Sequence, residues 1–360
     1  MNIFINARFL SQSLTGVQRY ATEFVKALDY LIETGQIDET KYSFVLLGPK
    51  NIQFYLNLKQ IPIKKVGISK GHLWEQVELP FYARNGLLLC LCNTGPLLKR
   101  NQIVVIHDAR VFALPQSYSF AFRSWYKLLL PNLGRIVKKV ITVSSFSGSE
   151  LIRYCHLNSA KIVVVSEGKE HILSTTRDVA VLKKNAIGDK PYVLAVSTLT
   201  RNKNFQAIVQ AIENIKQVDF ELVIVGGKNS QVYSQAQTPL PEFVKHLGYV
   251  SDGELRALYE QASCFVYPSL YEGFGLPPLE AMACGCPVIV SNAASIPEVC
   301  GEAAIYCNPY SVEDIADKIE QLLADKSLQE EMRLKGIERA KAFSWDKTVQ
   351  QTCAVIEELV

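Results

Sequence analysis

The stretch from residue 264 to residue 291 reads CFVYPSLYEGFGLPPLEAMACGCPVIVS. It begins with a short apolar run and then enters a loop that contains Gly273 and Gly275. A helix-like segment from Pro277 to Gly285 and a second apolar run follow, so the stretch predicts a strand, a glycine loop, a helix and a strand. Because a helix start offers N–H groups and partial positive charge, and glycine lets a ligand approach the backbone closely, this loop is a candidate phosphate site.

Two carboxylates bracket the glycine loop. Glu272 precedes the glycines, and Glu280 lies in the helix-like segment, with seven residues between them. A phosphate repels carboxylates. The two glutamates therefore suggest a ligand that also carries hydroxyl groups, which would donate hydrogen bonds to the carboxylates. A sugar nucleotide, with a diphosphate, a ribose and a hexose, has this composition. The alternative is that each glutamate is a solvated surface charge, which is the usual position of such residues.

The overall composition predicts a two-domain protein of the cytosol. The chain has 360 residues, of which 48% are hydrophobic and 20% charged, and its net charge of +3 is too small to indicate a nucleic-acid partner. Its nine cysteines, several of them in apolar runs, are expected to be free thiols in a reducing compartment. Their spacing does not match zinc sites, and no run of 18 apolar residues predicts a membrane span.

Basic residues gather in the first half of the chain, where aromatic residues accompany some of them. The basic groups are Lys64-Lys65, Lys99-Arg100, Arg123 to Lys127 and Lys138-Lys139. They suggest peripheral contact with an anionic membrane at its inner face. The alternative is a set of scattered, solvated faces.

Strand-like and helix-like stretches alternate on both sides of a polar segment, residues 166–178, which we expect to be a linker. The expected strands are residues 2–7, 42–47, 61–66, 87–91, 103–106, 140–143 and 161–165 before it, and 192–196, 221–225, 264–267 and 288–290 after it. This order predicts an α/β fold with two doubly wound parallel sheets. The helical end, residues 345–360, is expected to pack back across the first domain.

Four residues of the first half occupy positions at which such sheets bind ligands. Gly16 lies at the first strand-to-helix turn, and Arg19 follows in a first helical turn, where a cation is poorly placed for the helix dipole and suggests another role. His107 and Asp108 directly follow strand 103–106, and such strand ends open onto the ligand crevice. The alternatives are a surface arginine and a structural histidine.

The turn between strand 192–196 and the next helix carries two cations, Arg201 and Lys203. Both are expected to face the same crevice as the glycine loop, where they would neutralise a diphosphate. The alternative is a pair of solvated loop charges.

With these residues in place, the chain resembles the retaining nucleotide-sugar glycosyltransferases of family four over essentially its whole length. The most specific match is Glu272 to Glu280, which corresponds to the E-x7-E motif of that family. Supporting matches are Thr15 to Tyr20, His107-Asp108, Val143 to Ser147 and Lys203-Asn204. The hexapeptide from Gly71 to Gln76 is similar to a mannosyltransferase-like subgroup found in bacterial O-antigen and exopolysaccharide clusters.

The resemblance implies the GT-B fold, in which two Rossmann-like domains face each other across a cleft. Residues 1–172 would form the acceptor-binding domain, residues 173–343 the nucleotide-sugar-binding domain, and residues 344–360 a helix that returns to the first domain. The enzyme would be a retaining hexosyltransferase located in the cytoplasm or peripherally at the inner face of the cytoplasmic membrane.

The resemblance also implies a role for each candidate residue. Those implied to hold the nucleotide sugar are Gly16, Gly273, Phe274, Gly275, Leu276 and Glu280. Those implied to act in catalysis, on the hexose or on the leaving diphosphate, are His107, Arg201, Lys203 and Glu272. Those implied on the acceptor side are Arg19, Trp74 and Asp108. The arginine of the family's Pro-Arg-Lys-Asn turn is displaced by one position here, so Lys203 ranks ahead of Arg201.

The expected chemistry needs no cofactor besides the donor. The chain contains no D-x-D sequence, so we expect no divalent metal. Cleavage of the bond to the nucleoside diphosphate develops negative charge that cations and backbone amides stabilise. The family expectation is a front-face displacement, in which the departing phosphate helps to take the acceptor proton.

The resemblance favours GDP-mannose or a GDP-deoxyhexose as donor, ahead of a UDP-sugar, and an undecaprenyl-diphosphate-linked saccharide as acceptor. Two alternatives remain, a GT-B nucleotide-sugar epimerase and a non-catalytic sugar-nucleotide sensor. A dinucleotide-dependent oxidoreductase is disfavoured, because Pro278 stands where its G-x-G-x-x-G motif requires the third glycine.

Overall fold

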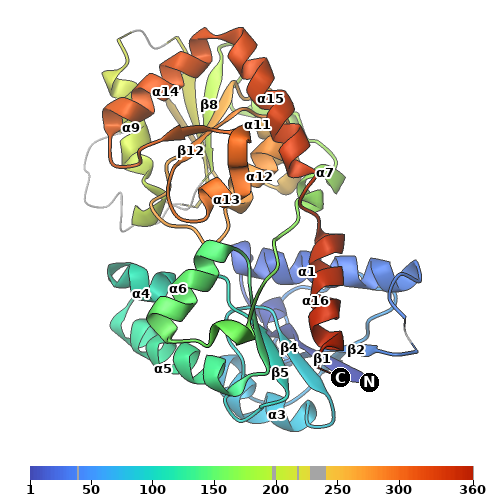
Figure 1. Cartoon of the computed structure of the whole chain (residues 1–360). Helices are drawn as coiled ribbons and strands as arrows, with labels where there is room; N and C mark the ends of the chain where they lie inside the picture. The colour runs from blue at the N-terminus through green and yellow to red at the C-terminus, as the bar shows by residue number, and fades with distance from the viewer. Residues whose placement is uncertain (39, 197–199, 217–218, 228–240, 360) are drawn as a thin grey trace. The chain divides into compact units, whose positions relative to one another are not determined.

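The computed structural model describes residues 1–38, 40–196, 200–216, 219–227 and 241–359. The chain forms two compact units, one made of Met1–Gly168 together with Ser344–Val360, and the other of Lys169–Phe343. Each unit contains one parallel sheet with helices packed on it (Figure 1). The predicted α/β class with two doubly wound sheets is therefore confirmed.

The first unit contains a seven-stranded sheet in the order β3-β2-β1-β4-β5-β6-β7, with every neighbouring pair parallel. Its strands are β1 (Asn2–Asn6), β2 (Ser43–Gly48), β3 (Ile63–Lys65), β4 (Leu87–Cys90), β5 (Gln102–Val105), β6 (Lys139–Thr142) and β7 (Ile162–Val164). The central strands β4 and β5 are buried along their whole length. Continuous aliphatic runs of this kind are typical of parallel strands that are covered on both faces.

The helices of the first unit are α1 (Gly16–Glu33), α2 (Gly71–Leu73), α3 (Leu79–Tyr82), α4 (Arg110–Ala113), α5 (Phe120–Ile136), α6 (Ser145–Cys155) and α16 (Trp345–Glu357), with short 3-10 helices at Ala7–Ser11, Pro115–Ser117 and Ser159–Lys161. Between α2 and α3 lies a π-helical turn, η2 (Trp74–Glu78). The terminal helix α16 packs against α1 (Figure 1). In the described residues, no helix has the length and hydropathy that a membrane crossing requires.

The second unit contains a six-stranded parallel sheet in the order β10-β9-β8-β11-β12-β13. Its strands are β8 (Tyr192–Val196), β9 (Glu221–Val225), β10 (Val244–Gly248), β11 (Cys264–Tyr267), β12 (Val288–Ser291) and β13 (Ile305–Cys307). Its helices are α7 (Glu170–Ser174), α8 (Ala180–Lys184), α9 (Phe205–Asn214), α11 (Asp252–Gln261), α12 (Leu276–Ala283), α13 (Ile296–Cys300), α14 (Val312–Ala324) and α15 (Lys326–Ala340), with 3-10 turns at Arg201–Lys203 and Gly301–Ala303.

The strand order reverses once in each sheet. In the first unit β1 lies between β2 and β4, and in the second unit β8 lies between β9 and β11. At such a point the loops after the two central strands leave in opposite directions, so a crevice opens at the carboxyl ends of the strands. Two of the polar clusters described below, those around Glu75 and Glu272, lie at these positions.

The segment expected to be a polar linker is more ordered than its composition suggested. Residues 170–174 form helix α7, and the side chains of Glu167 and His171 are buried. Both contact candidate site residues of their own unit, and the boundary between the two units falls within this segment, after Gly168. A helix of five residues is too short for its hydrophobic periodicity to be recognised in the sequence.

Candidate active site

Glu272 lies at the centre of a polar cluster in the second unit. Its Oε1 accepts hydrogen bonds from Lys203 Nζ at 2.7 Å, from the Tyr267 hydroxyl at 3.0 Å and from the Ser269 hydroxyl. Lys203 Nζ also contacts the hydroxyl and lies over the ring of Tyr267. The structure thus brings Lys203 and Glu272 into direct contact, 69 positions apart in the chain.

Lys203 is placed by the 3-10 turn Arg201–Lys203 after β8. The buried Asn202 carbonyl accepts hydrogen bonds from the Leu270 amide at 2.8 Å and from the Ser269 hydroxyl at 2.9 Å. These bonds tie the turn to the end of β11, next to Glu272. The side chain of Arg201 lies outside the part of the chain that the structure describes.

The glycine loop leads directly into α12. Gly275 precedes the helix with φ of +112°, a backbone conformation that glycine adopts without the strain a side chain would bring. A Cβ at this position would also lie 2.7 Å from Ile296 Cδ1. Because Pro277 and Pro278 carry no N–H group, the amides at this helix start that can approach an anion are those of residues 273–276.

Ser295, which the sequence did not single out, holds the glycine loop from behind. Its buried hydroxyl contacts two loop carbonyls, Glu272 O at 3.0 Å and Phe274 O at 2.7 Å. These contacts turn the two carbonyls toward the protein. A residue at this distance in the sequence gives no local signal of such a role.

Glu280 is a buried carboxylate with two partners of its own. Its Oε1 lies 2.7 Å from His171 Nε2, and its Oε2 accepts a hydrogen bond from the Tyr259 hydroxyl at 3.2 Å. Only 7% of Glu280 is exposed. Burial, and after it the charge of Glu280, raises the pKa of Tyr259 well above its usual value, so the phenol stays a hydrogen-bond donor. His171 and Tyr259 were not predicted.

In the first unit, His107 is a buried and firmly held imidazole. Its Nε2 lies 3.0 Å from the Leu91 carbonyl, its Nδ1 lies 3.5 Å from a carboxylate oxygen of Glu167, and its ring meets Tyr20 edge-on. The contact with a donor hexose that the resemblance implied for His107 stays a prediction.

The remaining candidates of the first unit differ in their surroundings. Gly16 is the first residue of α1, and a Cβ there would have no neighbour within 4 Å. Arg19 Nη1 lies 3.8 Å from Glu23 Oε1 within the same helix, and Asp108 Oδ1 accepts a hydrogen bond from the Arg110 amide at 2.9 Å.

Trp74 does not fit the acceptor side. Its side chain is completely buried in the core of the first unit, and its indole Nε1 donates a hydrogen bond to the Val66 carbonyl at 2.8 Å. A ring without exposed surface cannot stack on a saccharide. The motif that contains Trp74 reaches the surface through its neighbour His72 instead.

No metal cluster accompanies these residues in the described part of the chain, where no group of three or more His, Cys, Asp or Glu side chains is arranged to hold an ion. The charges at the glycine loop are those of Lys203 and Glu272, which form an ion pair. An anionic ligand can replace Glu272 as the partner of Lys203.

Comparisons with known proteins agree with this geometry. Sucrose-phosphate synthase from Thermosynechococcus elongatus superimposes with a TM-score of 0.75 at 18% identity, covering 99% of this chain and 98% of that one. Anabaena HepE in complex with UDP and glucose gives a TM-score of 0.75 at 17% identity, covering 99% and 100%. Two parallel-sheet, Rossmann-like units of this kind define the GT-B fold.

The sequence comparisons narrow this class to a family. The model for "Glycosyl transferases group 1" matches residues 180–341. O-antigen chain mannosyltransferase B of Escherichia coli is 30% identical over 382 residues, covering 98% of both chains, and O-antigen chain mannosyltransferase RfbU of Salmonella typhimurium is 29% identical, covering 85% and 87%. The chain therefore belongs to the group 1 glycosyltransferases, in a subgroup that resembles the bacterial O-antigen mannosyltransferases.

Proposed function

We propose that this glycosyltransferase moves a mannosyl or deoxyhexosyl group from a GDP-linked donor to a saccharide acceptor, with retention of configuration and without a metal. The names of the relatives support mannose as the sugar. A UDP-sugar is the second choice, because a neighbour of the same fold was solved with UDP-glucose. The observation that carries the proposal is the Lys203–Glu272 ion pair beside the glycine loop.

The proposed reaction uses this pair at the point where charge develops. The bond between the anomeric carbon and the β-phosphate oxygen breaks, and the nucleoside diphosphate leaves with an additional negative charge. Lys203 and the amides of residues 273–276 stabilise that charge, while Glu272, released from Lys203, binds the donor hydroxyls. The acceptor oxygen bonds to the anomeric carbon on the same face, and its proton passes to the leaving phosphate.

The proposed acceptor is a saccharide carried on undecaprenyl diphosphate, and the proposed process is the assembly of a surface polysaccharide. O-antigen chains are the products that the names of the relatives mention. A lipid-linked acceptor requires the cytoplasmic enzyme to work at a membrane surface.

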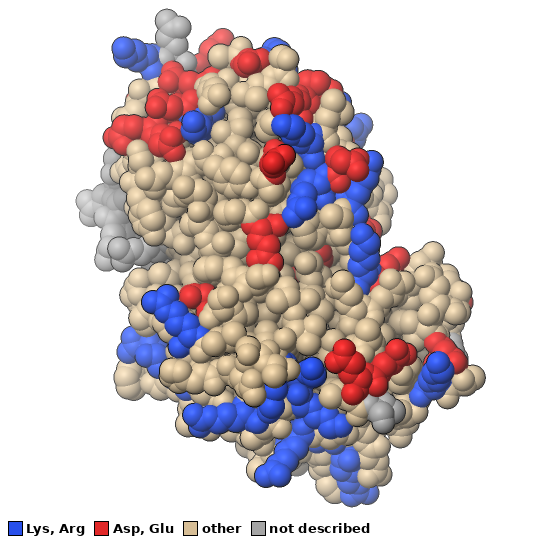
Figure 2. All heavy atoms as spheres, in the orientation of Figure 1, with Lys and Arg blue, Asp and Glu red and all other residues tan. Residues whose placement is uncertain are grey.

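Peripheral contact with an anionic membrane belongs to the same proposal. Leu73, Val77 and Phe81 are 62%, 60% and 60% exposed, and they follow one another at intervals of four residues along α2, η2 and α3. Figure 2 shows Lys and Arg side chains gathered over α3, α4 and α5 on the face drawn. Apolar side chains flanked by basic ones are typical of a surface that lies on anionic lipid.

One predicted basic residue does not contribute to this surface. Lys99 is buried, and its ammonium donates hydrogen bonds to the carbonyls of Ala83 and Gly86, both at 2.8 Å. Burial lowers the pKa of Lys99.

We expect the protein to sediment with phosphatidylglycerol vesicles but not with phosphatidylcholine vesicles. The double substitution Val77→Ser and Phe81→Ser should reduce the bound fraction.

Thermal denaturation in the presence of nucleotides tests the donor class. GDP, UDP, ADP, TDP and NAD are each added with and without EDTA, because a ligand that binds the folded state raises the melting temperature. GDP is expected to give the largest increase, unchanged by EDTA. Stabilisation by NAD alone would contradict the glycosyltransferase proposal, and a loss of the GDP effect with EDTA would contradict metal independence.

Product analysis separates the two remaining alternatives. An epimerase would convert the donor into an altered free nucleotide sugar without any acceptor. A sugar-nucleotide sensor would bind the donor without turnover. Transfer to an acceptor that Glu272→Ala abolishes would exclude both.

A further inference from the structure

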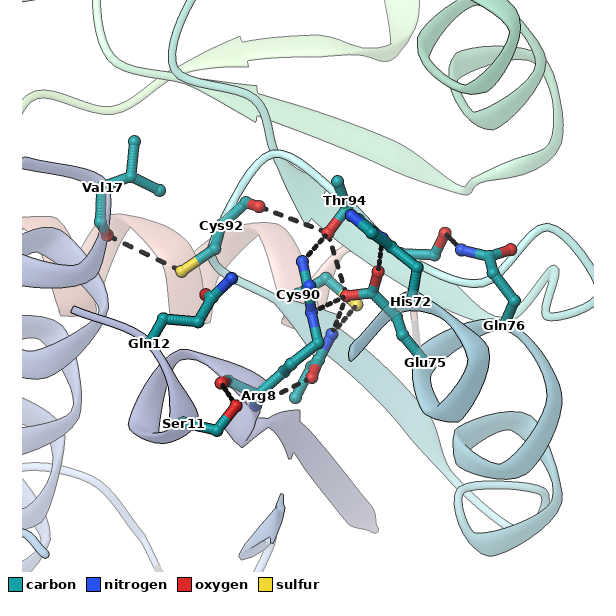
Figure 3. A network of polar contacts seen from close by, with 12 residues as sticks. Arg8, Ser11, Gln12, Val17, His72, Glu75, Gln76, Cys90, Cys92 and Thr94 are labelled. Atoms are coloured by element: carbon teal, nitrogen blue, oxygen red, sulfur yellow. Dashed lines mark hydrogen bonds and ion pairs between the residues drawn. The ribbon is translucent and has the colours of Figure 1, made fainter. Parts of the chain in front are cut away.

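The crevice end of the first unit carries a pair formed by an imidazole and a buried carboxylate, His72 and Glu75, which neither the sequence motifs nor the relatives assign to a function. The two residues lie one turn apart across the junction of α2 and η2. His72 Nδ1 lies 3.2 Å from Glu75 Oε2, and Figure 3 shows the ring above the carboxylate. The π-helical turn that begins at Trp74 is a rare geometry, often found at functional sites.

The other oxygen of Glu75 is fully occupied from the sheet. Glu75 Oε1 accepts hydrogen bonds from Asn6 Nδ2 at 2.8 Å, from Arg8 Nε at 3.1 Å and from the Thr94 hydroxyl at 2.9 Å (Figure 3). Asn6 ends β1, and Thr94 follows β4, so the carboxylate is held at the point where the strand order reverses. Arg8 also donates to Thr94 through Nη2 at 2.9 Å.

These contacts cancel the charges of the cluster and orient the imidazole. Burial alone would raise the pKa of Glu75, but the hydrogen bond with His72 and the charge of Arg8 together hold it below its usual range. Glu75 is therefore a carboxylate and Arg8 its counter-ion. With Nδ1 directed at Glu75, the His72 Nε2 has no hydrogen-bond partner within the described ranges, and the side chain is 40% exposed, whereas that of Glu75 is 1% exposed.

Aromatic side chains of α5 lie beside this imidazole. The ring of Trp125 is 5.6 Å from that of His72, and its Nε1 is buried without a hydrogen-bond partner among the described residues. Tyr126, the next residue, stacks on Phe122 at 4.3 Å, and Phe122 stacks on Tyr118 at 5.2 Å. A few oriented polar atoms next to aromatic rings are the usual composition of a site for a small polar ligand.

We infer that His72 and Trp125 form the subsite that binds the acceptor saccharide. His72 Nε2 accepts a hydrogen bond from a sugar hydroxyl, and the partly exposed ring of Trp125 packs against the sugar. Glu75 and Arg8 act as positioning residues behind His72. This inference rests on the proposed function, and it assigns to His72 and Trp125 the acceptor role that the buried Trp74 cannot perform.

The charge balance favours a neutral, hydroxyl-bearing ligand over a phosphate. An anion needs a cation that can exchange its partner, and the Arg8 guanidinium is committed to Glu75 and Thr94 inside the protein. A sugar hydroxyl can donate a hydrogen bond to His72 Nε2 without any counter-charge.

Saturation-transfer NMR with methyl α-mannopyranoside and methyl α-N-acetylglucosaminide tests the inference without requiring turnover. We expect the wild-type protein to bind at least one of them with millimolar affinity. His72→Ala and Trp125→Ala should each weaken this binding at least tenfold. Trp125→Phe keeps an aromatic ring at this position, and it should lose less affinity than Trp125→Ala.

His156→Asn is the matched control. It removes an exposed histidine of the same unit that caps α6 with φ of +53°, a conformation that asparagine tolerates. It should leave saccharide binding unchanged. Binding of neither saccharide by the wild-type protein, or equal binding by His72→Ala, would overturn the inference.

The effect of GDP on the melting temperature is measured for the same variants. This effect should be unchanged in all of them, because the proposed diphosphate contacts, Lys203 and the glycine loop, belong to the other unit. A wild-type protein that binds a saccharide but no nucleotide would contradict the proposed function and leave the saccharide subsite standing. A protein that binds GDP but no saccharide would do the reverse.

Discussion

Each unit places a glutamate paired with a cation where its strand order reverses, but the two pairs are built differently. Glu75 and Arg8 are buried, and hydrogen bonds from Asn6 and Thr94 close the cluster around them. Glu272 instead pairs with Lys203, whose flexible side chain comes from a short 3-10 turn. The pair lies next to the glycine loop, in which Gly275 has a positive φ.

The difference shows how charge balance selects the ligand. A buried arginine with fixed partners cannot leave its carboxylate, so the Arg8–Glu75 cluster offers no exchangeable charge to a ligand. A lysine bound by one carboxylate oxygen can exchange it for a phosphate at small cost, since both partners are anions. Under the two proposals, the same topological position would serve a saccharide in one unit and a diphosphate in the other.

The largest expected effect is on stability. Glu75→Ala leaves the Arg8 charge buried without a partner and should lower the free energy of unfolding by about 3–5 kcal/mol. Glu272→Ala should cost less than half of this, because Lys203 can turn toward solvent. Urea denaturation of both variants measures the two free energies of unfolding. Equal losses of stability would contradict the distinction between the closed pair, Arg8–Glu75, and the exchangeable pair, Lys203–Glu272.

Lys203→Ala tests the exchangeable pair through its chemistry. Removing one preorganised charge from the leaving group is expected to reduce kcat by about 10²–10³-fold, as for the loss of one donor to a developing oxyanion. The affinity for GDP should fall by a smaller factor. Steady-state transfer kinetics and calorimetric titration with GDP provide the two numbers, and Lys203→Arg, which retains the charge, is the control.

Glu280→Ala should act mainly on binding. It removes the contact with the nucleotide sugar that the resemblance implies for Glu280, and it separates His171 from this carboxylate. We expect GDP affinity to weaken about tenfold, or about 1.4 kcal/mol. Calorimetry with GDP measures this change. A variant that binds GDP normally but loses turnover would assign Glu280 to catalysis instead.

The smallest expected effect is the pH dependence of the stability that the closed pair, Arg8–Glu75, contributes. The pKa of Glu75 is lowered in the folded protein, so its contribution to stability is present above the unfolded pKa, about 4.3, and is lost as the pH falls through the folded value. The difference in unfolding free energy between the wild-type protein and Glu75→Gln should therefore shrink as the pH falls below 4. A difference that stays constant from pH 6 to pH 3 would show that Glu75 does not titrate in this range.

Much of the second unit's candidate site was visible in the sequence because its parts are adjacent in the chain. Glu272, the two glycines and Glu280 lie within nine positions, and strand β11 and helix α12 flank them as predicted. Lys203 was found through its position after a strand. Ser295, His171 and Tyr259 were missed, because single polar residues in short helices or next to apolar runs carry no pattern.

Prediction was weaker in the first unit, where the cluster is assembled from distant segments. Arg8, Glu75 and Thr94 come from three segments far apart in the chain, and nothing in their local sequence indicates that they meet. The assignment of Trp74 failed for a related reason. On a helix, adjacent residues point in different directions, so the motif that contains Trp74 presents His72 to the surface and buries the indole.

The sequence by itself determined the fold class, the alternation of strands and helices, and the glycine loop with its two carboxylates. These features follow from hydrophobic periodicity and from residue types at short spacing, because both depend only on residues that are near one another in the chain. Only the tertiary structure decided which ion pair is fixed by surrounding hydrogen bonds, as Arg8–Glu75 is, and which can exchange its carboxylate for another anion, as Lys203–Glu272 can. Burial and pairing depend on contacts between residues far apart in the chain, and the folded core sets the free energy of each charge.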